Sequence, residues 1–324
     1  MSTVSIPVQA TDLQTAEQLA QQGLVAGKNY PGLTNLCALD KPLKQAGAHS
    51  HKKNTRKMTD QAREKRAKAA TVAPQQVFDN LYFVGNRQVA SWVIRTSEGL
   101  IMIDAMNTNQ QAKKIIIAGM ESLGLDPNEL RYLIITHAHG DHYGGQEYLT
   151  ERFSPRLVMS EADWRELEKP KQEISNPRWG KAPTRDLSVD NGDTITLGDT
   201  RIQLAVTPGH TLGTLSLIFP VQDQGKPHMA ALWGGTGLNF GPNAERLAMY
   251  SSSAEQFRLL AQENQVDVFL SNHPTRDNSL ARMKQLNNRN HQQTHPFVDP
   301  DALQAFALLR DCSQAQLKKL QASQ

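Results

Sequence analysis

The sequence predicts a mixed α/β fold with four layers, an αβ/βα sandwich in which two sheets pack face to face and helices cover both outer faces. Two observations lead to this prediction. Runs rich in β-branched and aromatic residues begin near Val77, and they fall into two groups separated by helical patterns. The order along the chain is therefore β-rich, mixed, β-rich, mixed. This order is typical of two sheets with helices outside them.

The first half opens with three successive strands bounded by Asn, Gly and Ser. A helix follows and is closed by Gly124 and Pro127. The next strand is short and apolar, as strands buried on both faces are, and it runs directly into His137. The expected elements are strands over 77–85, 90–96, 99–105, 131–136 and 156–160, and helices over 112–125 and 144–153.

The second half repeats this order. Four strands with alternating or apolar patterns precede a helix, and another buried strand then ends at Ser271-Asn272-His273. Two further helices close the chain. The expected elements are strands over 193–198, 201–207, 214–219, 229–233 and 266–270, and helices over 253–264, 279–291 and 299–321.

Residues 1–75 differ from the rest, and we expect a basic, helical or partly disordered extension there, before a catalytic domain over 76–324. Lys41 to Lys68 is crowded with Lys, Arg, Gln and Ala, which favours a solvated helix or mobile arm over a patch for acidic partners. Cys37 and Cys312 form no C-x-x-C pair. One long-range disulfide between them is compatible with an oxidising compartment.

The bulk properties exclude several classes of function. The net charge is only +3 and the sequence pI is near 8.8, so nothing predicts a nucleic-acid partner. No apolar run reaches the length of a membrane span. The first ten residues have no basic or apolar signal region, so the chain as written predicts a cytoplasmic protein, or a periplasmic or secreted one whose signal has been removed. The oligomeric state is not predicted.

A cluster of metal-binding residue types follows the buried strand over 131–136. His137, His139, Asp141 and His142 lie within six residues. Neutral imidazole and carboxylate are the usual ligands of zinc. Because alternate residues of an extended loop point to the same side, His137 and His139 can face one ion while Asp141 and His142 face another. The run therefore predicts a metal site.

Two more histidines stand in a similar context. His210 lies in Thr207-Pro-Gly-His-Thr, a turn after a strand, and His273 lies at the end of another buried strand. Loops at such strand ends converge on one mouth of a fold. The remaining histidines have no such context, and we expect them on the surface; they are His49, His51, His228, His291 and His295.

The part of the chain from about Val77 to Asn278 resembles the metallo-β-lactamase superfamily. The H-x-H-x-D-H run, the T-P-G-H-T turn and the late strand-His pattern occur in the same order as in that family. The resemblance implies the metallo-β-lactamase fold and a zinc-dependent hydrolase with a small-molecule substrate. It also implies that Asp104 supports the metal loop and that Thr211 lies beside the ligands.

One difference from most members of the superfamily indicates which subclass the sequence resembles. Most members carry a Gly-Asp after the strand that follows the turn, whereas the equivalent stretch here, 232–237, contains no acid and no cysteine. The set that remains is similar to that of the third subclass of class B β-lactamases. This resemblance implies two zinc ions per chain. The first is held by His137, His139 and His210, and the second by Asp141, His142 and His273.

By this resemblance the enzyme opens a cyclic amide bond of the β-lactam type through attack of a metal-bound hydroxide. Asp141 and His210 take the catalytic roles, the first beside the nucleophile and the second at the zinc that polarises the carbonyl. Tyr143 and Thr236 are candidate substrate contacts, although Leu238 stands where a second serine is common. Trp233 is expected in the core.

Two other functions stay open. A lactone or other ester hydrolase could use the same dizinc site, although such enzymes normally carry the bridging Asp. A non-catalytic metal-binding protein on this fold belongs to a different class, and it would be expected to have lost ligands.

Overall fold

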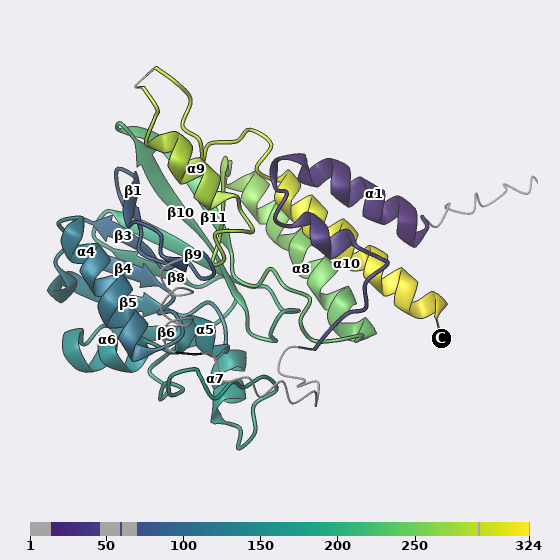
Figure 1. Cartoon of the computed structure of the whole chain (residues 1–324), viewed down its shortest axis with the longest axis horizontal. Helices are drawn as coiled ribbons and strands as arrows, with labels where there is room; N and C mark the ends of the chain where they lie inside the picture. The colour runs from purple at the N-terminus through teal and green to yellow at the C-terminus, as the bar shows by residue number, and fades with distance from the viewer. Residues whose placement is uncertain (1–13, 46–58, 60–69, 291, 324) are drawn as a thin grey trace, which may run out of the picture.

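The computed structural model describes residues 14–45, 59, 70–290 and 292–323, and they form two β-sheets with helices on the outer face of each (Figure 1). The larger sheet has seven strands in sequence order, and the smaller has five in the order β12-β11-β10-β9-β8. The strands of the larger sheet are β1 (Gln75–Phe78), β2 (Leu81–Phe83), β3 (Trp92–Thr96), β4 (Gly99–Ile103), β5 (Leu130–Ile134), β6 (Arg156–Ser160) and β7 (Leu187–Val189). Those of the smaller are β8 (Thr194–Leu197), β9 (Thr200–Val206), β10 (Leu215–Asp223), β11 (Lys226–Trp233) and β12 (Val268–Ser271).

The helices divide between the two outer faces. Side chains from α4, α6 and α7 pack with the larger sheet, whereas α1, α8 and α10 pack with the smaller one. The helices are α1 (Ala16–Ala26), η1 (Gly27–Asn29), η2 (Thr34–Cys37), α3 (Asn109–Gln111), η3 (Ala112–Ile117), α4 (Ala118–Ser122), η4 (Pro127–Glu129), α5 (Gly140–Tyr143), α6 (Gln146–Phe153), α7 (Glu161–Glu168), α8 (Ala244–Glu263), α9 (Ser279–Leu286) and α10 (Gln304–Ala322).

Three layers of buried apolar side chains separate these four layers of secondary structure. Successive residues of a strand point to opposite faces of its sheet. Leu232 of β11 therefore lies between the two sheets, whereas Trp233 lies between the smaller sheet and its helices. Likewise Ile101 of β4 faces the other sheet and Met102 faces the helices. The predicted four-layer αβ/βα sandwich is confirmed.

The amino-terminal residues pack on the carboxy-terminal helix. Helix α1 begins at a capping box in which Thr15 and Gln18 exchange hydrogen bonds. Leu19 and Ala20 of α1 belong to the same core cluster as α8 and α10. The described part of the 1–75 region thus shares its core with the rest of the chain, and most of the basic stretch from Lys41 to Lys68 lies outside the described residues.

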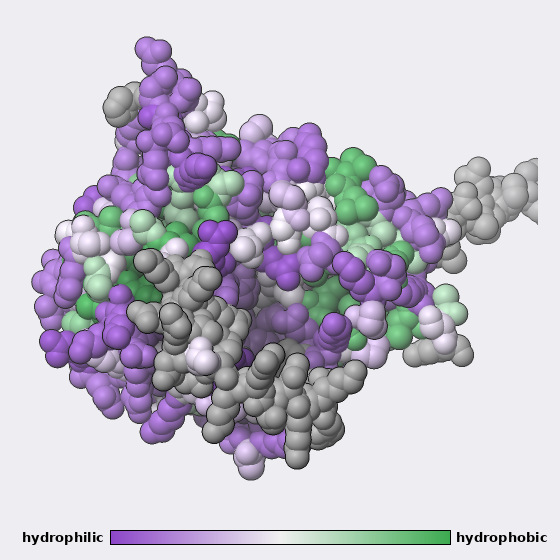
Figure 2. Space-filling view, in the orientation of Figure 1, coloured by the Kyte–Doolittle hydropathy of each residue, from purple (hydrophilic) through white to green (hydrophobic). Residues whose placement is uncertain are grey.

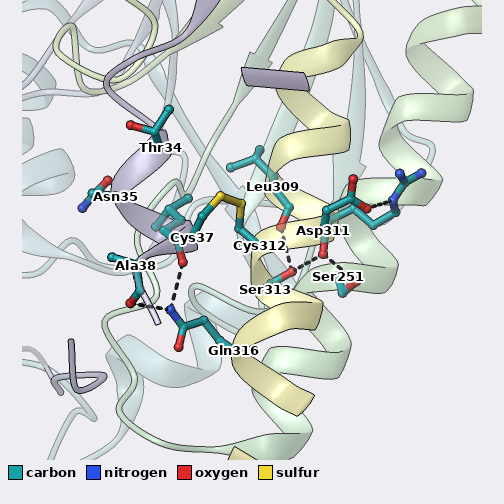
Figure 3. Close-up of a disulfide and its surroundings, with 12 residues drawn as sticks. Thr34, Asn35, Cys37, Ala38, Ser251, Leu309, Asp311, Cys312, Ser313 and Gln316 are labelled. Atoms are coloured by element: carbon teal, nitrogen blue, oxygen red, sulfur yellow. Dashed lines mark hydrogen bonds and ion pairs between the residues drawn. A yellow bond between two sulfur atoms is a disulfide. The ribbon is translucent and has the colours of Figure 1, made fainter. Parts of the chain in front are cut away.

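A disulfide joins Cys37 to Cys312 and ties the segment after α1 to α10 (Figure 3). Both cysteines are buried, and Gln316 of α10 donates to the carbonyls of Leu36 and Ala38 on either side of Cys37. A Cβ on Gly23 of α1 would lie 2.4 Å from the sulfur of Cys312, so only glycine lets α1 lie against the disulfide.

Several predicted elements differ from the structure in detail. The expected strand over 77–85 is two strands, because the chain turns between Phe78 and Leu81. The expected helix over 112–125 begins as a π-helical segment, and the helix expected from residue 253 begins nine residues earlier, where Asn243 caps it. The structure also contains β7 and α7, which were not predicted.

Two histidines expected on the surface are buried, so that prediction is wrong for them. His228 pairs with Asp267, its Nδ1 lying 2.5 Å from the carboxylate, and its side chain is only 6% exposed. His295 stacks on Phe78 with ring centroids 4.0 Å apart. Its Nε2 lies 2.8 Å from the carbonyl of Val77. His49, His51 and His291 lie outside the described residues.

Hydrophilic side chains cover most of the face shown in Figure 2, and apolar ones gather over α1. This helix carries Leu24 and Val25, which are exposed. In the described part of the chain, no helix combines the length and apolar character that a membrane span requires.

Candidate metal centre

The metal-binding run starts immediately after β5, in the middle of the larger sheet. The chain leaves the strand through Thr136, passes His137 and His139 in an extended loop, and enters the short helix α5. Gly140 is needed there because a Cβ would lie 2.5 Å from the side chain of Trp179. The ring of His142 lies 4.2 Å from that of His137, but the donor atoms of Asp141 and His142 group with that of His273 rather than with those of the first two histidines. Local geometry thus separates the run into two ligand sets.

The first set consists of His137, His139 and His210, all of them buried. The Nε2 atom of His210 lies 3.1 Å from Nε2 of His137 and 3.1 Å from Nδ1 of His139. Three ligands at the usual zinc–nitrogen distance in a tetrahedral site would lie about 3.3 Å apart. Because these ring nitrogens converge at nearly that spacing, the set fits a zinc ion.

The second set consists of Asp141, His142 and His273. Nε2 of His142 lies 3.6 Å from the carboxylate of Asp141, and the rings of His142 and His273 are 5.0 Å apart. The Nε2 atom of His142 is buried and has no hydrogen-bond partner among the described residues. A buried polar atom without a partner is costly, and a metal ion at this point would satisfy it. This set therefore also fits a cation.

Three of the histidines, His142, His210 and His273, are each held through Nδ1 by a carbonyl or carboxylate oxygen. Nδ1 of His210 lies 2.6 Å from the carbonyl of Gly237, and Nδ1 of His273 lies 2.6 Å from that of Gln88. Nδ1 of His142 lies 2.6 Å from the carboxylate of Asp104. Partners of this kind orient the ring and select the tautomer that a metal requires.

Asp104 joins the second set to the start of the metal loop. Its carboxylate accepts hydrogen bonds from the backbone N–H and the hydroxyl of Thr136 while it pairs with His142. Its backbone lies in the left-handed region, with φ at 63°. Non-glycine residues are uncommon there, and strained backbone of this kind clusters at functional sites.

Substituting Asp104→Asn should weaken binding of the metal at Asp141, His142 and His273 by about 10- to 100-fold. An amide has one acceptor oxygen, whereas the carboxylate accepts from three donors. Zinc titration against a chromogenic chelator measures this change. Asp79→Asn is the matched control because Asp79 accepts from Gly225 on an exposed turn. Two tight zinc ions in Asp104→Asn would contradict the prediction.

Burial sets the protonation of the first set. Burial, together with positive charge on neighbouring histidines, lowers the pKa values of His137 and His210 well below their usual range. Burial also lowers the pKa of His139 to about 4, although the carboxylate of Asp141 opposes this shift. These imidazoles are therefore neutral at pH 7, which is the form that binds a metal.

Charge partners set the protonation of the second set. Burial alone would lower the pKa of His142, but the carboxylates of Asp104 and Asp141 raise it. Burial alone would raise the pKa of Asp141, but His142, His273 and His139 lower it. Asp141 is therefore an ionised carboxylate at neutral pH. An anionic ligand at this position would stabilise a bound cation.

The structure places the other predicted residues near the two sets. Thr236 is 1% exposed, and within the described part of the chain its hydroxyl has no hydrogen-bond partner. Gly237 follows it and binds His210. Tyr143 is buried beside the ring of Trp179, and Thr211 donates to Asp163. Trp233 is fully buried and packs against Tyr250 and Phe306, which confirms its expected place in the core.

Two residues near the site were not predicted. Trp179 stacks on His139 with an interplanar angle of 25°, and nothing in the local sequence pattern distinguishes this tryptophan from one in the core. Asp163 is buried, and burial raises its pKa to about 6, although hydrogen bonds from Thr211, Ala138 and Gly213 favour its charged form. Its place in the first turn of a helix gave no sign of these contacts.

A known protein family matches the part of the chain that carries most of the candidate metal-binding residues. A model described as the metallo-β-lactamase superfamily matches residues 84–223, which include the H-x-H-x-D-H run and the T-P-G-H-T turn. The match to this superfamily thus covers the central part of the chain. The matched residues include five of the six that form the two candidate metal sets.

Two solved structures of metallo-β-lactamases each cover 78% of this chain. A subclass B3 metallo-β-lactamase of Bradyrhizobium japonicum is 27% identical, with a TM-score of 0.65, and covers 78% of this chain and 97% of its own. The metallo-β-lactamase of Legionella gormanii is 24% identical, with a TM-score of 0.66, over 78% and 98%. At 24% identity, the similarity to the Legionella gormanii protein shows a shared fold alone.

The curated relatives are shorter matches. A hydroxyacylglutathione hydrolase of Mesorhizobium japonicum is 35% identical over 105 residues, which are 32% of this chain and 34% of the relative. One of Pseudomonas putida is 29% identical over 137 residues, 40% and 46% of the two chains. A probable polyketide biosynthesis zinc-dependent hydrolase of Bacillus subtilis is 35% identical over 92 residues, 28% and 35%. The alignments thus span less than half of these relatives.

Proposed function

We propose that this metallo-β-lactamase superfamily hydrolase binds two zinc ions and opens a cyclic amide of the β-lactam type. The observation that carries the proposal is the pair of ligand sets, three histidines in one and Asp-His-His in the other, without an acid in the stretch 232–237. The similarity to a subclass B3 metallo-β-lactamase over 97% of that protein's length supports the same substrate class.

Two zinc ions, when bound, would supply hydroxide at neutral pH and Lewis acidity toward a carbonyl oxygen. The side chains of the protein would fix the positions of the two ions. His137, His139 and His210 would hold the first ion, and Asp141, His142 and His273 the second. The carboxylate of Asp141, ionised at neutral pH and half-buried, would also accept a hydrogen bond from the attacking water.

The substrate would lie between Trp179 and Thr236. Trp179 is half-buried and stacks on His139, so one face of the indole forms a wall beside the first metal set. A flat aromatic wall suits a bicyclic ring system and excludes water from the reacting bond. The hydroxyl of Thr236, which lacks a partner within the described residues, could donate to a substrate carboxylate.

A second candidate is hydrolysis of a thioester, lactone or other ester at the same site. The observation in its favour is that several curated relatives are named hydroxyacylglutathione hydrolases, which act on a thioester. The absence of an acid in 232–237 argues against it, because hydrolases of this type in the superfamily normally carry one there. A non-catalytic metal-binding protein is less well supported, since all six ligands are present.

The deciding experiment uses zinc-loaded protein with a chromogenic cephalosporin, a carbapenem, a glutathione thioester and a lactone. We expect zinc-dependent turnover of the β-lactams near ~10 per second, a typical enzyme median. Chelator-treated protein is the control, and readdition of zinc should restore activity. Fast hydrolysis of the thioester or lactone with negligible β-lactam turnover would overturn the substrate assignment and leave the hydrolase assignment intact.

Substituting Thr236→Val should lower kcat/KM for a β-lactam with a free carboxylate by about 10- to 100-fold, because a hydrogen bond to a charged group contributes about 1.5–3 kcal/mol. Valine preserves the shape of threonine and removes only the hydroxyl. Thr236→Ser, which keeps the hydroxyl, is the matched control and should stay near the wild-type value. Steady-state kinetics on the acid and its methyl ester measure the effect; an equal loss on both substrates would contradict it.

A further inference from the structure

Asp163 lies at the start of α7, outside all the predicted motifs, yet its carboxylate binds both loops of the first metal set. Its side chain is 1% exposed. Oδ2 accepts hydrogen bonds from the backbone N–H of Ala138 and the hydroxyl of Thr211, each at 2.8 Å. Oδ1 accepts from the backbone N–H of Gly213 at 2.9 Å. All three partners are donors.

Two of these donors are next to the histidines of the first set in the sequence. Ala138 stands between His137 and His139, and Thr211 directly follows His210. One carboxylate therefore joins the loop that carries two histidines of the first set to the turn that carries the third, across 73 residues of sequence. Besides these contacts, the two segments share the backbone hydrogen bond from Leu215 to Thr136.

The start of α7 holds the turn from a second side. The hydroxyl of Ser160 donates to the carbonyl of Gly213 at 2.6 Å and accepts from the N–H of Asp163. A Cβ on Gly213 would lie 2.2 Å from the Ser160 hydroxyl, so glycine is required for this close approach. Both backbone polar groups of Gly213 are thus bound by the first turn of α7. This arrangement makes the turn a fixed part of the fold.

We propose that Asp163 is a positioning residue that sets the distance between His210 and the His137–His139 pair, and so determines metal affinity at the first set. The inference rests on the proposed zinc site. A carboxylate suits the three donors because it offers acceptors only. An amide at this position would turn its NH2 group toward a backbone N–H and leave a buried donor unpaired.

The expected consequence is a change in metal binding at one set. Metal–ligand distances in well-formed sites lie within about 0.2 Å of their usual values, so a widened gap between the two loops should lower affinity. We expect Asp163→Asn to weaken the ion at the first set by about 10- to 100-fold, as substitutions of ligand-supporting residues commonly do. Binding at Asp141, His142 and His273 should remain close to wild type.

The test is a titration of full-length metal-free protein with Zn²⁺ against a chromogenic chelator, followed by Co²⁺ absorption spectra of the filled sites. The expected result is one tight and one weakened ion in Asp163→Asn, with an altered cobalt spectrum. Asp186→Asn is the matched control, because Asp186 accepts from the N–H of Leu157 and pairs with Arg156 away from the metal ligands. This control should bind two ions tightly.

Thr211→Val provides a second route in case Asp163→Asn does not fold. It removes one of the three donors to Asp163 and should reduce affinity at the first set by a smaller factor than Asp163→Asn. Unchanged zinc affinity and an unchanged cobalt spectrum in a folded Asp163→Asn, or in Thr211→Val if the former is unfolded, would overturn the proposal. Wild-type protein that fails to bind two ions would instead overturn the proposed function.

Discussion

Substituting His139→Ala should reduce hydrolysis by on the order of 10³-fold or more, because the residue belongs to the set whose ion would polarise the carbonyl. His142→Ala should reduce it similarly through the other set. His139 is buried between Trp179 and the rings of His137 and His210, so no water-exposed ligand could replace it. Each variant should retain one zinc ion, measured by elemental analysis of dialysed protein together with kcat.

His228→Ala is the matched control, since it removes a buried histidine that pairs with Asp267 and belongs to neither metal set. We expect two zinc ions and near wild-type turnover in this variant. Full activity in His139→Ala with only one zinc ion bound would show that the first set is not needed for the reaction. Loss of activity in His139→Ala with both zinc ions retained would mean that the imidazole of His139 contributes to the reaction by a route other than binding a metal.

Replacing both cysteines of the Cys37–Cys312 disulfide by alanine should lower the free energy of unfolding by about 2–5 kcal/mol. The bond closes a loop of 275 residues in sequence separation, and a crosslink of that length restricts the unfolded chain strongly. Denaturant unfolding of wild type and double variant measures the difference. Wild-type protein unfolded under reducing conditions should match the variant.

The disulfide is not expected to affect metal binding. The residues of the metal sets lie in other segments, so zinc content of the double variant at low temperature should stay at the wild-type value. An unchanged unfolding midpoint in the double variant would contradict the stabilising role, and free thiols in protein purified without reductant would contradict the bond itself.

The fold could be predicted because its signals are local. Alternation along β10, β11 and β12 reports which residues face the other sheet, and this pattern depends only on the two-residue period of a strand. Predictions failed where a side-chain contact, rather than the periodicity of the sequence, decided the structure. Asn243 starts α8 ahead of its apolar stretch, and His295 is buried because Phe78, 217 residues away, stacks on it.

The sequence alone predicted a metal-dependent chemistry, because a metal site needs particular donor atoms and H-x-H-x-D-H places four of them in six residues. It also indicated His210 and His273, since both follow strands. Only the tertiary structure decided how these residues are held. The bonds of Asp104 to His142, of Asp163 to Ala138 and of Trp179 to the face of His139 join residues between 25 and 40 positions apart. No periodicity of a helix or a strand encodes such pairs, because they depend on how separate elements pack together.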